Sequence, residues 1–421
     1  MSCHLWLVTL ASDRIADLDE AEATLLRSLG LQLSGDQMQS LGGAQAAFVI
    51  PVFRDIGETL PAPLTGHEHF GWLDGVSQPG VRGRISPDAT PTGQMDLLTP
   101  RLNPNDASQG QPGQNCIYPG SFVFGYPAQN PNSGSEPGDM KQGGTNFYDD
   151  GSLVVYRRLK QRVGAFNAML SAKATGDAID RDILGAKLVG RFKDGSPLVA
   201  NDSATHADIG SSDATANWFS FQSQLKSGAT GDASQFALGS APLPDPSGLK
   251  CPFAAHVRKA NPRDDLGPAS DIHRLLRRGI PYGQSLADGA PDDNVDRGLI
   301  FIAYQTSIAD QFEFATTNWV NNSNFLNAGS GVDPILGAAA GTRERKTAHI
   351  MMNRPDGDSD DITVDLTEDF IVPTGGGYFF SPSVDAIAKL AGVSGNPTRC
   401  LGDHPPITPP RPTPNPAPYP S

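Results

Sequence analysis

The chain has 421 residues, and 38% of them are hydrophobic, so it can bury one large core or two cores of medium size. Its 32 basic and 46 acidic residues give a formal net charge of -14, which argues against nucleic acid and anionic membrane surfaces as partners. No apolar run approaches the roughly 20 residues of a transmembrane helix. We therefore expect a soluble, globular protein.

The first half of the chain alternates short predicted elements with a long loop region. Residues 5–11 (LWLVTLA) read as a strand, residues 16–30 as an amphipathic helix and residues 46–52 (AAFVIPV) as a second strand. Residues 60–147 are rich in Gly, Pro, Asn and Asp, and so long an irregular stretch is typical of functional loops. Residues 151–170 then change from a strand pattern to a helical one.

The second half is predicted to begin with loop after residue 174. The later elements are a buried strand at 298–307, a helix at 309–322, a hairpin at 370–383 and a short helix at 384–392. Strands and helices mix without regular alternation, which favours an α+β fold with two sheet-and-helix domains over a doubly wound parallel sheet. The proline-rich tail from Pro405 can bury little and is expected to be extended.

The N-terminus and the cysteines give weak indications of location. The segment MSCHLWLVTLASDR lacks the basic region and the cleavage site of a signal peptide, whereas two glycosylation triplets, at Asn201 and Asn321, favour export. Four scattered cysteines predict neither a zinc site nor a disulfide scaffold. We expect mostly buried thiols, with one disulfide if the protein is exported, among Cys3, Cys116, Cys251 and Cys400.

A carboxylate in a glycine-rich turn is the first residue that could carry chemistry. No Walker loop, dinucleotide fingerprint, HExxH motif or nucleophile elbow is present. In FGWLDGVSQP, residues 70–79, Asp74 lies between Gly71 and Gly75. Asp-Gly is ordinary turn chemistry, and this reading is favoured locally. The alternative is that the glycines let the backbone approach a planar ligand and leave Asp74 as an acid or base.

A histidine among cations is the second feature. In CPFAAHVRKANPR, residues 251–263, His256 precedes Arg258, Lys259 and Arg263. A lone histidine is more often structural than a ligand. A metal-binding imidazole beside cations nevertheless suits a metallo-cofactor that bears carboxylates, such as haem.

The third feature is a pair of arginines before a Pro-Tyr turn. The segment IHRLLRRGIPYG, residues 272–283, reads as a helix that ends at Gly279 and presents Arg277 and Arg278. Arginines at a helix end usually complement the helix dipole, which is the structural alternative to a functional role. His273 is expected to be structural.

Taken together, these three segments resemble the dye-decolorizing peroxidases, and specifically the fungal branch of that haem peroxidase family. The blocks FGWLDGVSQP, CPFAAHVRKANPR and LLRRGIPYG resemble its GxxDG, haem-ligand and distal-arginine segments. Further blocks, DGSLVVYRRLKQRVGAFN, GLIFIAYQTS and GGGYFFSPS, follow the family order. The resemblance covers the chain from near residue 1 to about residue 400.

The resemblance implies roles for individual residues. His256 resembles the axial ligand of the haem iron, and Asp74 the distal acid-base residue. Arg277 is preferred over Arg278 as the distal arginine, because the family places it four residues before the proline, here Pro281. Glu313 resembles the carboxylate that accepts the other N–H of the proximal histidine. The remaining positions are Leu299 and Phe301 as apolar pocket residues, Arg258 and Arg263 as contacts of the haem propionates, and Trp319 and Tyr282 as electron-transfer residues.

The sequence around Trp319 is compatible with two positions of this side chain. The resemblance implies a surface radical site there, and Asn318, Asn321 and Asn322 favour the surface. The alternative is a core residue on an amphipathic helix. Tyr282 corresponds to a radical site near the haem.

The resemblance also implies an architecture and an activity. It implies two ferredoxin-like domains of the dimeric α/β-barrel type, at 1–206 and 207–404, with the tail at 405–421 and haem held mainly by the second domain. Members of this branch carry a further N-terminal segment, so we expect the first domain here to lack its first strand and helix. The implied activity is reduction of hydrogen peroxide by one haem b, with one-electron oxidation of dyes and phenolics.

Location, assembly and rival functions are also expectations. The branch is secreted, and a monomer or weak homodimer is expected. Two alternatives are a haem carrier or dechelating protein without useful peroxidase turnover, and a truncated interaction protein that binds no haem.

Overall fold

The computed structural model describes the residues 7–29, 31–34, 37–40, 53–82, 116–142, 147–174, 180–200, 217, 219, 221–222, 244–337, 346–353, 359–366 and 368–392. The helices are α1 (Ile15–Ser28), α2 (Val163–Lys173), α3 (Arg181–Val189), α4 (His256–Ala260) and α5 (Val384–Leu390). Two consecutive π-helical segments are η7 (Ile308–Glu313) and η8 (Ala315–Val320), and short 3-10 segments include η5 (Arg263–Asp265) and η6 (Gly267–His273). The strands are β1 (Leu31–Ser34), β2 (Gln37–Ser40), β3 (Gly80–Val81), β4 (Cys116–Ile117), β5 (Tyr126–Asn130), β6 (Ser133–Lys141), β7 (Ser152–Gln161), β8 (Leu276–Arg277), β9 (Ile280–Tyr282), β10 (Gly298–Gln305), β11 (Lys346–Asn353), β12 (Ser359–Leu366) and β13 (Ile371–Ser381).

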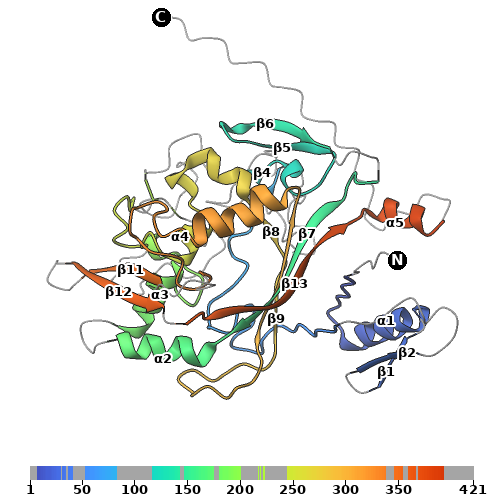
Figure 1. Cartoon of the computed structure of the whole chain (residues 1–421), viewed down its shortest axis with the longest axis horizontal. Coiled ribbons are helices and arrows are strands. Elements are labelled where there is room, and N and C mark those ends of the chain that lie inside the picture. The colour runs from blue at the N-terminus through green and yellow to red at the C-terminus, as the bar shows by residue number, and fades with distance from the viewer. Residues whose placement is uncertain are drawn as a thin grey trace, which may run out of the picture.

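A five-stranded antiparallel sheet forms the centre of the molecule (Figure 1). Its order is β13-β7-β10-β8, and β9 also pairs with β10. The register aligns Arg277 of β8, Ala303 of β10, Val155 of β7 and Tyr378 of β13 in one row. Because directly paired residues point to the same face of a sheet, these four side chains share one face. The sheet joins β7, from the range 1–206, to strands beyond residue 206, and the predicted division into two domains remains a prediction.

The opposite face of this sheet carries an apolar cluster. Val154, Ile300 and Ile302 are buried there, with Tyr282 from β9. Along each strand, these residues alternate with the residues on the Arg277 face, because successive side chains of a strand point to opposite faces of the sheet. The face of the sheet opposite Arg277 is therefore buried and apolar.

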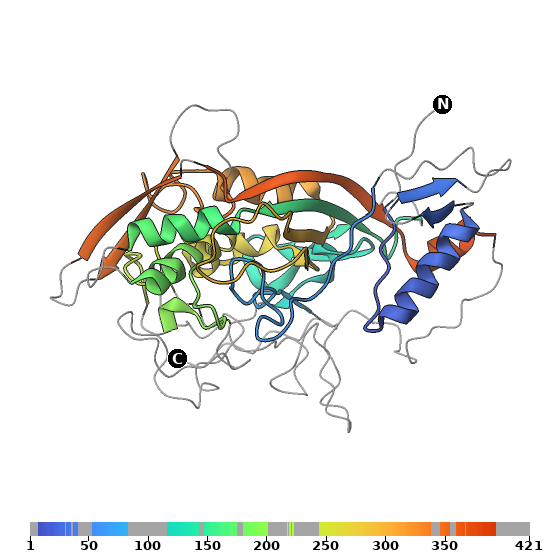
Figure 2. The same ribbon diagram turned by 90° about the horizontal axis from the view of Figure 1, so that it is seen from below.

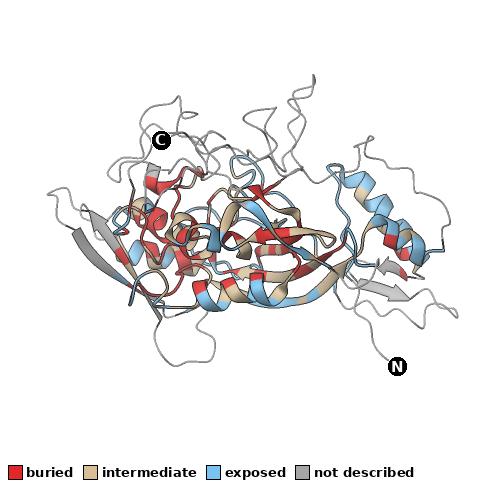
Figure 3. Ribbon diagram, turned by 90° about the horizontal axis from the view of Figure 1, so that it is seen from above, coloured by how far each residue is buried: buried red, intermediate tan, exposed pale blue. Residues whose placement is uncertain are grey.

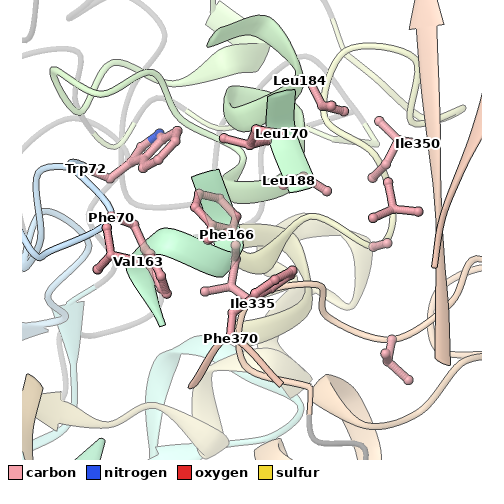
Figure 4. Close-up of a cluster of buried hydrophobic side chains, with 13 residues drawn as sticks. Phe70, Trp72, Val163, Phe166, Leu170, Leu184, Leu188, Ile335, Ile350 and Phe370 are labelled. Atoms are coloured by element: carbon pink, nitrogen blue, oxygen red, sulfur yellow. The ribbon is translucent and has the colours of Figure 1, made fainter. Parts of the chain in front are cut away.

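The main core lies beside the sheet, where α2 and α3 pack on the loop that contains the predicted Asp74 turn (Figure 4). On α2, Val163, Phe166 and Leu170 are buried at helical spacing. The Phe166 ring contacts Phe70 at 4.7 Å and the edge of Trp72 at 5.9 Å between centroids. Burial of each such side chain contributes about 1.5–3 kcal/mol, so the loop is anchored to the core at both aromatics.

The N-terminal helix and hairpin form a separate lobe. In Figures 1 and 2, α1 with β1 and β2 lies to one side of the main body, and Figure 3 shows α1 largely exposed. One contact to the connecting segment is the ion pair between Arg54 Nε and Glu22 Oε1, at 2.6 Å. Among the described residues, those that form the Asp74 turn and its surroundings come from the main body and not from this lobe.

Several sequence predictions are confirmed and several are wrong. The helix expected at 16–30 is α1, the change from strand to helix at 151–170 is β7 and α2, and the strand at 298–307 is β10. The helix expected at 309–322 forms as the π-helical segments η7 and η8, and the short C-terminal helix is α5. Residues 7–10 are not a strand, and the strand expected at 46–52 and the tail lie outside the described residues.

Two other predictions fail for clear physical reasons. The segment after residue 174 contains α3, which has Asp180 as its N-cap and the left-handed Gly190 at its end. The expected hairpin at 370–383 is the single strand β13, because its glycines form an irregularity between Pro373 and Gly375 rather than a turn.

The structure also bears on the cysteines and on membrane insertion. Cys116 and Cys251 are buried, as expected, whereas Cys3 and Cys400 lie outside the described residues. Within the part of the chain that the structure describes, no helix has both the length and the apolar content to cross a bilayer.

Candidate active site

Asp74 is held in a tightly bonded turn. Its backbone N–H donates to the Gly66 carbonyl at 3.0 Å, and the Trp72 indole N–H donates to the Arg191 carbonyl at 2.8 Å. Gly71 and Gly75 have φ values of 97° and 76°, which residues with a side chain rarely adopt. Asp74 can therefore be both a turn residue and a functional acid or base, because the turn holds its carboxylate in place.

A second carboxylate, that of Glu68, stabilises the segment that leads into this turn. Glu68 Oε2 accepts the Phe70 N–H and Oε1 accepts the Trp72 N–H, each at 2.9 Å, and the Gln161 amide also donates to Glu68. Burial raises the pKa of Glu68 to about 7, although these hydrogen bonds oppose the shift. The sequence analysis did not identify Glu68, and its closeness to Asp74 became evident only from the fold.

Arg277 reaches Asp74 from the edge of the central sheet. Arg277 Nη1 lies 3.7 Å from Asp74 Oδ1, and both side chains are partly exposed. The Arg277 N–H donates to the side-chain oxygen of Gln78, in the same SQP segment that follows the Asp74 turn. The helix predicted up to Gly279 is wrong, because residues 276–277 pair with β10 as strand β8. The predicted association of Asp74 with Arg277 is confirmed.

His256 begins the short helix α4 and bonds to a buried aspartate. Its Nδ1 lies 2.7 Å from Asp333 Oδ2, and the Asp333 side chain is fully buried. Asp333 Oδ1 also accepts the backbone N–H groups of Ile335 and Leu336 at 2.8 and 2.9 Å, so the carboxylate has three donors. Burial lowers the pKa of His256, but the Asp333 carboxylate outweighs it and the net pKa is raised.

The prediction that Glu313 holds His256 is wrong. Glu313 Oε1 instead accepts the hydroxyl of Tyr378 at 2.8 Å, at the exposed end of η7. Because a carboxylate can only accept, Asp333 makes His256 Nδ1 the donor and leaves Nε2 as the acceptor nitrogen. Among the residues that the structure describes, Nε2 has no hydrogen-bond partner, and 31% of the His256 side chain remains accessible.

Leu299 and Phe301 lie on the face of the sheet that carries Arg277. Ala303 pairs with Arg277, and residues two and four positions before it on β10 point to the same side. Both apolar side chains are partly buried. Their predicted place beside the Asp74–Arg277 pair agrees with this register.

The two predicted propionate ligands have different surroundings. Arg258 is fully buried, and its guanidinium forms two hydrogen bonds with Asp265, at 2.7 and 2.8 Å. It also donates to the carbonyls of Cys251 and Asp245, so its donors are used within the protein. The prediction that Arg258 contacts a ligand carboxylate is therefore wrong.

Arg263 lies near two other cations, the buried Arg191 and the half-buried Arg274. Its guanidinium donates to Ser77 Oγ at 3.0 Å and to two backbone carbonyls, and Arg191 also donates to Ser77 Oγ. Burial lowers the pKa of Arg263, and the charges of Arg191 and Arg274 lower it further. Within the described residues, no carboxylate lies within ion-pair distance of Arg263 or Arg274. This group of cations fits an anionic ligand.

The two predicted electron-transfer residues are both buried. Trp319 is only 3% exposed and stacks on Phe325 with an interplanar angle of 16°, so the predicted surface position is wrong. Its ring also contacts Phe314 and His273 edge-on. Tyr282 pairs with Gly298 and packs with Ile300, on the face of the sheet opposite Arg277. Their roles in electron transfer remain predictions.

Comparison with known proteins agrees with the resemblance. A family model described as "Dyp-type peroxidase, C-terminal" matches residues 127–328. Peroxidase 2 of Mycetinis scorodonius is 31% identical over 92% of this chain and 68% of that protein. A dye-decolorizing peroxidase of Mycena epipterygia shows the same identity and coverage. The chain belongs to the dye-decolorizing peroxidase family.

Solved structures of peroxidases from this family share the fold. An ancestral D-type dye-decolorizing peroxidase matches with a TM-score of 0.64 and 29% identity, over 89% of this chain and 71% of that one. A decolorizing peroxidase from Auricularia auricula-judae matches with a TM-score of 0.62 and 27% identity, over 90% and 72% of the two chains. The predicted α+β, ferredoxin-like fold is confirmed, and the chain is an oxidoreductase of the dye-decolorizing peroxidase type.

The residues of this peroxidase fit the haem that its family uses. Burial acts to lower the pKa values of both His256 and Arg274, yet 31% of the His256 side chain is accessible, so we infer that they line a recess in the protein. The charges of Asp74 and Arg277 act on His256 across this recess. An imidazole with a free Nε2 is the usual axial haem ligand, and Arg263 and Arg274 would balance two carboxylates.

The sequence analysis missed the residues that complete this arrangement. Asp333, Arg191 and Arg274 reach the recess from separate segments, and neither arginine has an identifying local pattern. Only Asp333 had a usable signal, since an Asp before Pro-Ile-Leu is typical of a side chain that caps a turn.

Proposed function

We propose that this chain binds one haem b and uses it to reduce hydrogen peroxide while it oxidises dyes, phenolics and other bulky aromatic reductants one electron at a time. The supporting observation is the convergence of two pairs, His256 with Asp333 and Asp74 with Arg277, on one recess. The family membership of the chain supports the same activity. A monomer or weak homodimer, and secretion, are further proposals that rest on the family resemblance alone.

His256 and Asp333 would hold the cofactor. His256 would bind the iron through Nε2, and Arg263 with Arg274 would balance the propionates. Bound haem would supply the redox-active iron that accepts oxidising equivalents from peroxide. The Asp333 carboxylate keeps Nδ1 as a donor and makes the imidazole a stronger electron donor at Nε2.

Asp74 would carry the proton. Peroxide cleavage needs a base that takes a proton from one oxygen and returns it to the other. Asp74 Oδ1 accepts the Gly75 N–H at 2.7 Å, and Oδ2 is the oxygen that we assign to this transfer. The neighbouring Arg277, with Nη1 3.7 Å from Asp74 Oδ1, would stabilise the negative charge that develops as the O–O bond breaks.

Arg277 also favours a peroxidase over a haem carrier. The Asp74 carboxylate and the Arg277 guanidinium lie 3.7 Å apart, and haem storage alone would give this pair no chemical role. The pair instead supplies the proton transfer and the charge stabilisation that peroxide chemistry requires.

The test is reconstitution of the purified chain with haemin, followed by a dye assay with and without hydrogen peroxide. We expect a Soret band that saturates at one haem per chain and dye bleaching that requires peroxide. His256→Ala should remove the Soret band while circular dichroism shows a folded protein. Haem binding without peroxide-dependent bleaching would support the carrier function instead, and no haem binding would contradict both.

A further inference from the structure

A surface tyrosine lies at the end of a short series of aromatic rings from the active-site face. Tyr378 is 46% exposed on β13, an edge strand of the central sheet (Figure 1). It shares the face and the row of Arg277, three strands away, which corresponds to about 14 Å at the usual strand spacing. Tyr378 is therefore accessible to large molecules, and its side chain is still directed to the same side of the sheet as the site.

Two phenylalanines lie between Tyr378 and the site. The Tyr378 ring meets the edge of Phe312 with the centroids 6.3 Å apart, and Phe312 contacts Phe301 at 6.1 Å. Phe301 is one of the apolar residues on the Arg277 face. The rings are in the separation range of ordinary aromatic pairs, so they give continuous contact from Phe301, on the Arg277 face of the sheet, to the surface.

The Tyr378 hydroxyl has a proton acceptor in place. It donates to Glu313 Oε1 at 2.8 Å. Partial burial and this carboxylate raise the pKa of the phenol, so it stays protonated at neutral pH. A phenol that loses an electron becomes a strong acid, and an adjacent carboxylate can take the proton in the same step.

The cation beside the ring makes this proton transfer necessary. The guanidinium of Arg157 lies over the rings of Tyr378 and Phe312, at 4.8 and 5.2 Å from their centroids. Its positive charge would disfavour a positively charged tyrosine radical. Oxidation is therefore favourable only as loss of an electron together with a proton, which leaves a neutral radical.

We propose that Tyr378 is a surface oxidation site at which bulky phenols and other aromatic reductants deliver electrons to the active site. The proposal rests on the proposed peroxidase function, which supplies the oxidant. In the first step, one electron passes from Tyr378 to the peroxide-oxidised site and the phenolic proton passes to Glu313. In the second, the reductant returns one electron, Glu313 returns the proton to Tyr378, and a phenolic reductant releases its own proton to solvent.

Two variants and a matched control test the proposal by activity. Tyr378→Phe and Glu313→Gln should each lower the ratio of kcat/KM for an anthraquinone dye to kcat/KM for guaiacol by at least tenfold. Tyr148→Phe, which alters another exposed tyrosine, should leave this ratio within twofold of the wild type. A Tyr378→Phe ratio equal to that of the wild type would overturn the proposal.

A second readout does not depend on turnover. The haem-free protein should be oxidised with a one-electron chemical oxidant and examined by electron paramagnetic resonance. We expect a tyrosyl radical that is largely lost in Tyr378→Phe and retained in Tyr148→Phe. An undiminished signal in Tyr378→Phe would contradict the proposal. If the reconstituted wild type does not react with peroxide, the proposed function fails, and this experiment still tests Tyr378.

Discussion

The bond from His256 to Asp333 should control haem affinity, and Asp333→Asn is its most informative perturbation. The variant amide oxygen can still accept the N–H groups of Ile335 and Leu336, so the local turn should persist. Its NH2 group would face His256 Nδ1, which would favour the tautomer with the proton on Nε2. That tautomer has no lone pair at the nitrogen that binds iron.

The expected magnitude follows from this single bond. A hydrogen bond to a charged group contributes about 1.5–3 kcal/mol, which corresponds to roughly 10-fold to 100-fold in affinity. Loss of an outer partner of a metal ligand usually costs the same range. Haemin titration followed at the Soret band should show this weakening for Asp333→Asn. Glu313→Gln is the control, because Glu313 is bonded to Tyr378 and should leave haem affinity unchanged.

Two results would refute this reasoning. Equal haem affinity in Asp333→Asn and the wild type would show that Asp333 does not set the ligand nitrogen. A loss in Glu313→Gln as large as in Asp333→Asn would restore the role that the sequence analysis gave to Glu313. Urea denaturation of both haem-free variants would separate a loss of affinity from a loss of folding.

Three other changes give distinct outcomes. Arg277→Leu should slow the reaction with peroxide by about 10²–10³-fold in stopped-flow, because it removes a stabilising charge while the backbone pairing of β8 persists; an unchanged rate would exclude Arg277 from the chemistry. The pKa of Glu68 is raised from 4.5 to about 7, so its contribution to stability is present below pH 4.5 and is lost as the pH rises through 7. The urea midpoint of Glu68→Gln should therefore fall less between pH 5 and pH 8 than that of the wild type. The same pH dependence in the variant and the wild type would contradict this. Trp319→Ser should reduce the free energy of unfolding by about 3–5 kcal/mol, and wild-type stability would contradict its core position.

The sequence predicted the parts of the site that lie in short, contiguous segments. Asp74, His256 and Arg277 each lie in a block whose residue order alone resembles the family, and their convergence follows from the fold. The strand β10 was also clear, because a run of branched and aromatic residues is typical of a buried strand. Local patterns were sufficient for residues that each lie within one short, characteristic segment.

Contacts between distant segments could not be predicted in this way. Asp333 is 77 residues from His256, and the resemblance of Glu313 to the family carboxylate contains no information on its distance from His256. Arg258 looked like a ligand because it is a cation near His256, but Asp265 satisfies its guanidinium. Sequence proximity does not show which partner a buried charge finds.

Burial patterns explain two further errors. Trp319 has asparagines around it in the sequence, but only residues on the same helical face share its environment, and that face packs on Phe325. Helix α3 was missed because Leu184 to Leu188 are all buried, including Lys187, so the segment lacks an amphipathic pattern. Both features depend on which surfaces cover a helix.

The rate of the first reaction with peroxide tests the central claim most directly. Haemin-reconstituted wild type and Asp74→Asn should be mixed with hydrogen peroxide in a stopped-flow instrument and followed at the Soret band. The wild type should react rapidly, and Asp74→Asn should be slower by about 10²–10⁴-fold, because it retains the turn but has no base. Equal rates in two proteins with the same haem content would contradict the assignment of Asp74 and the peroxidase mechanism built on it.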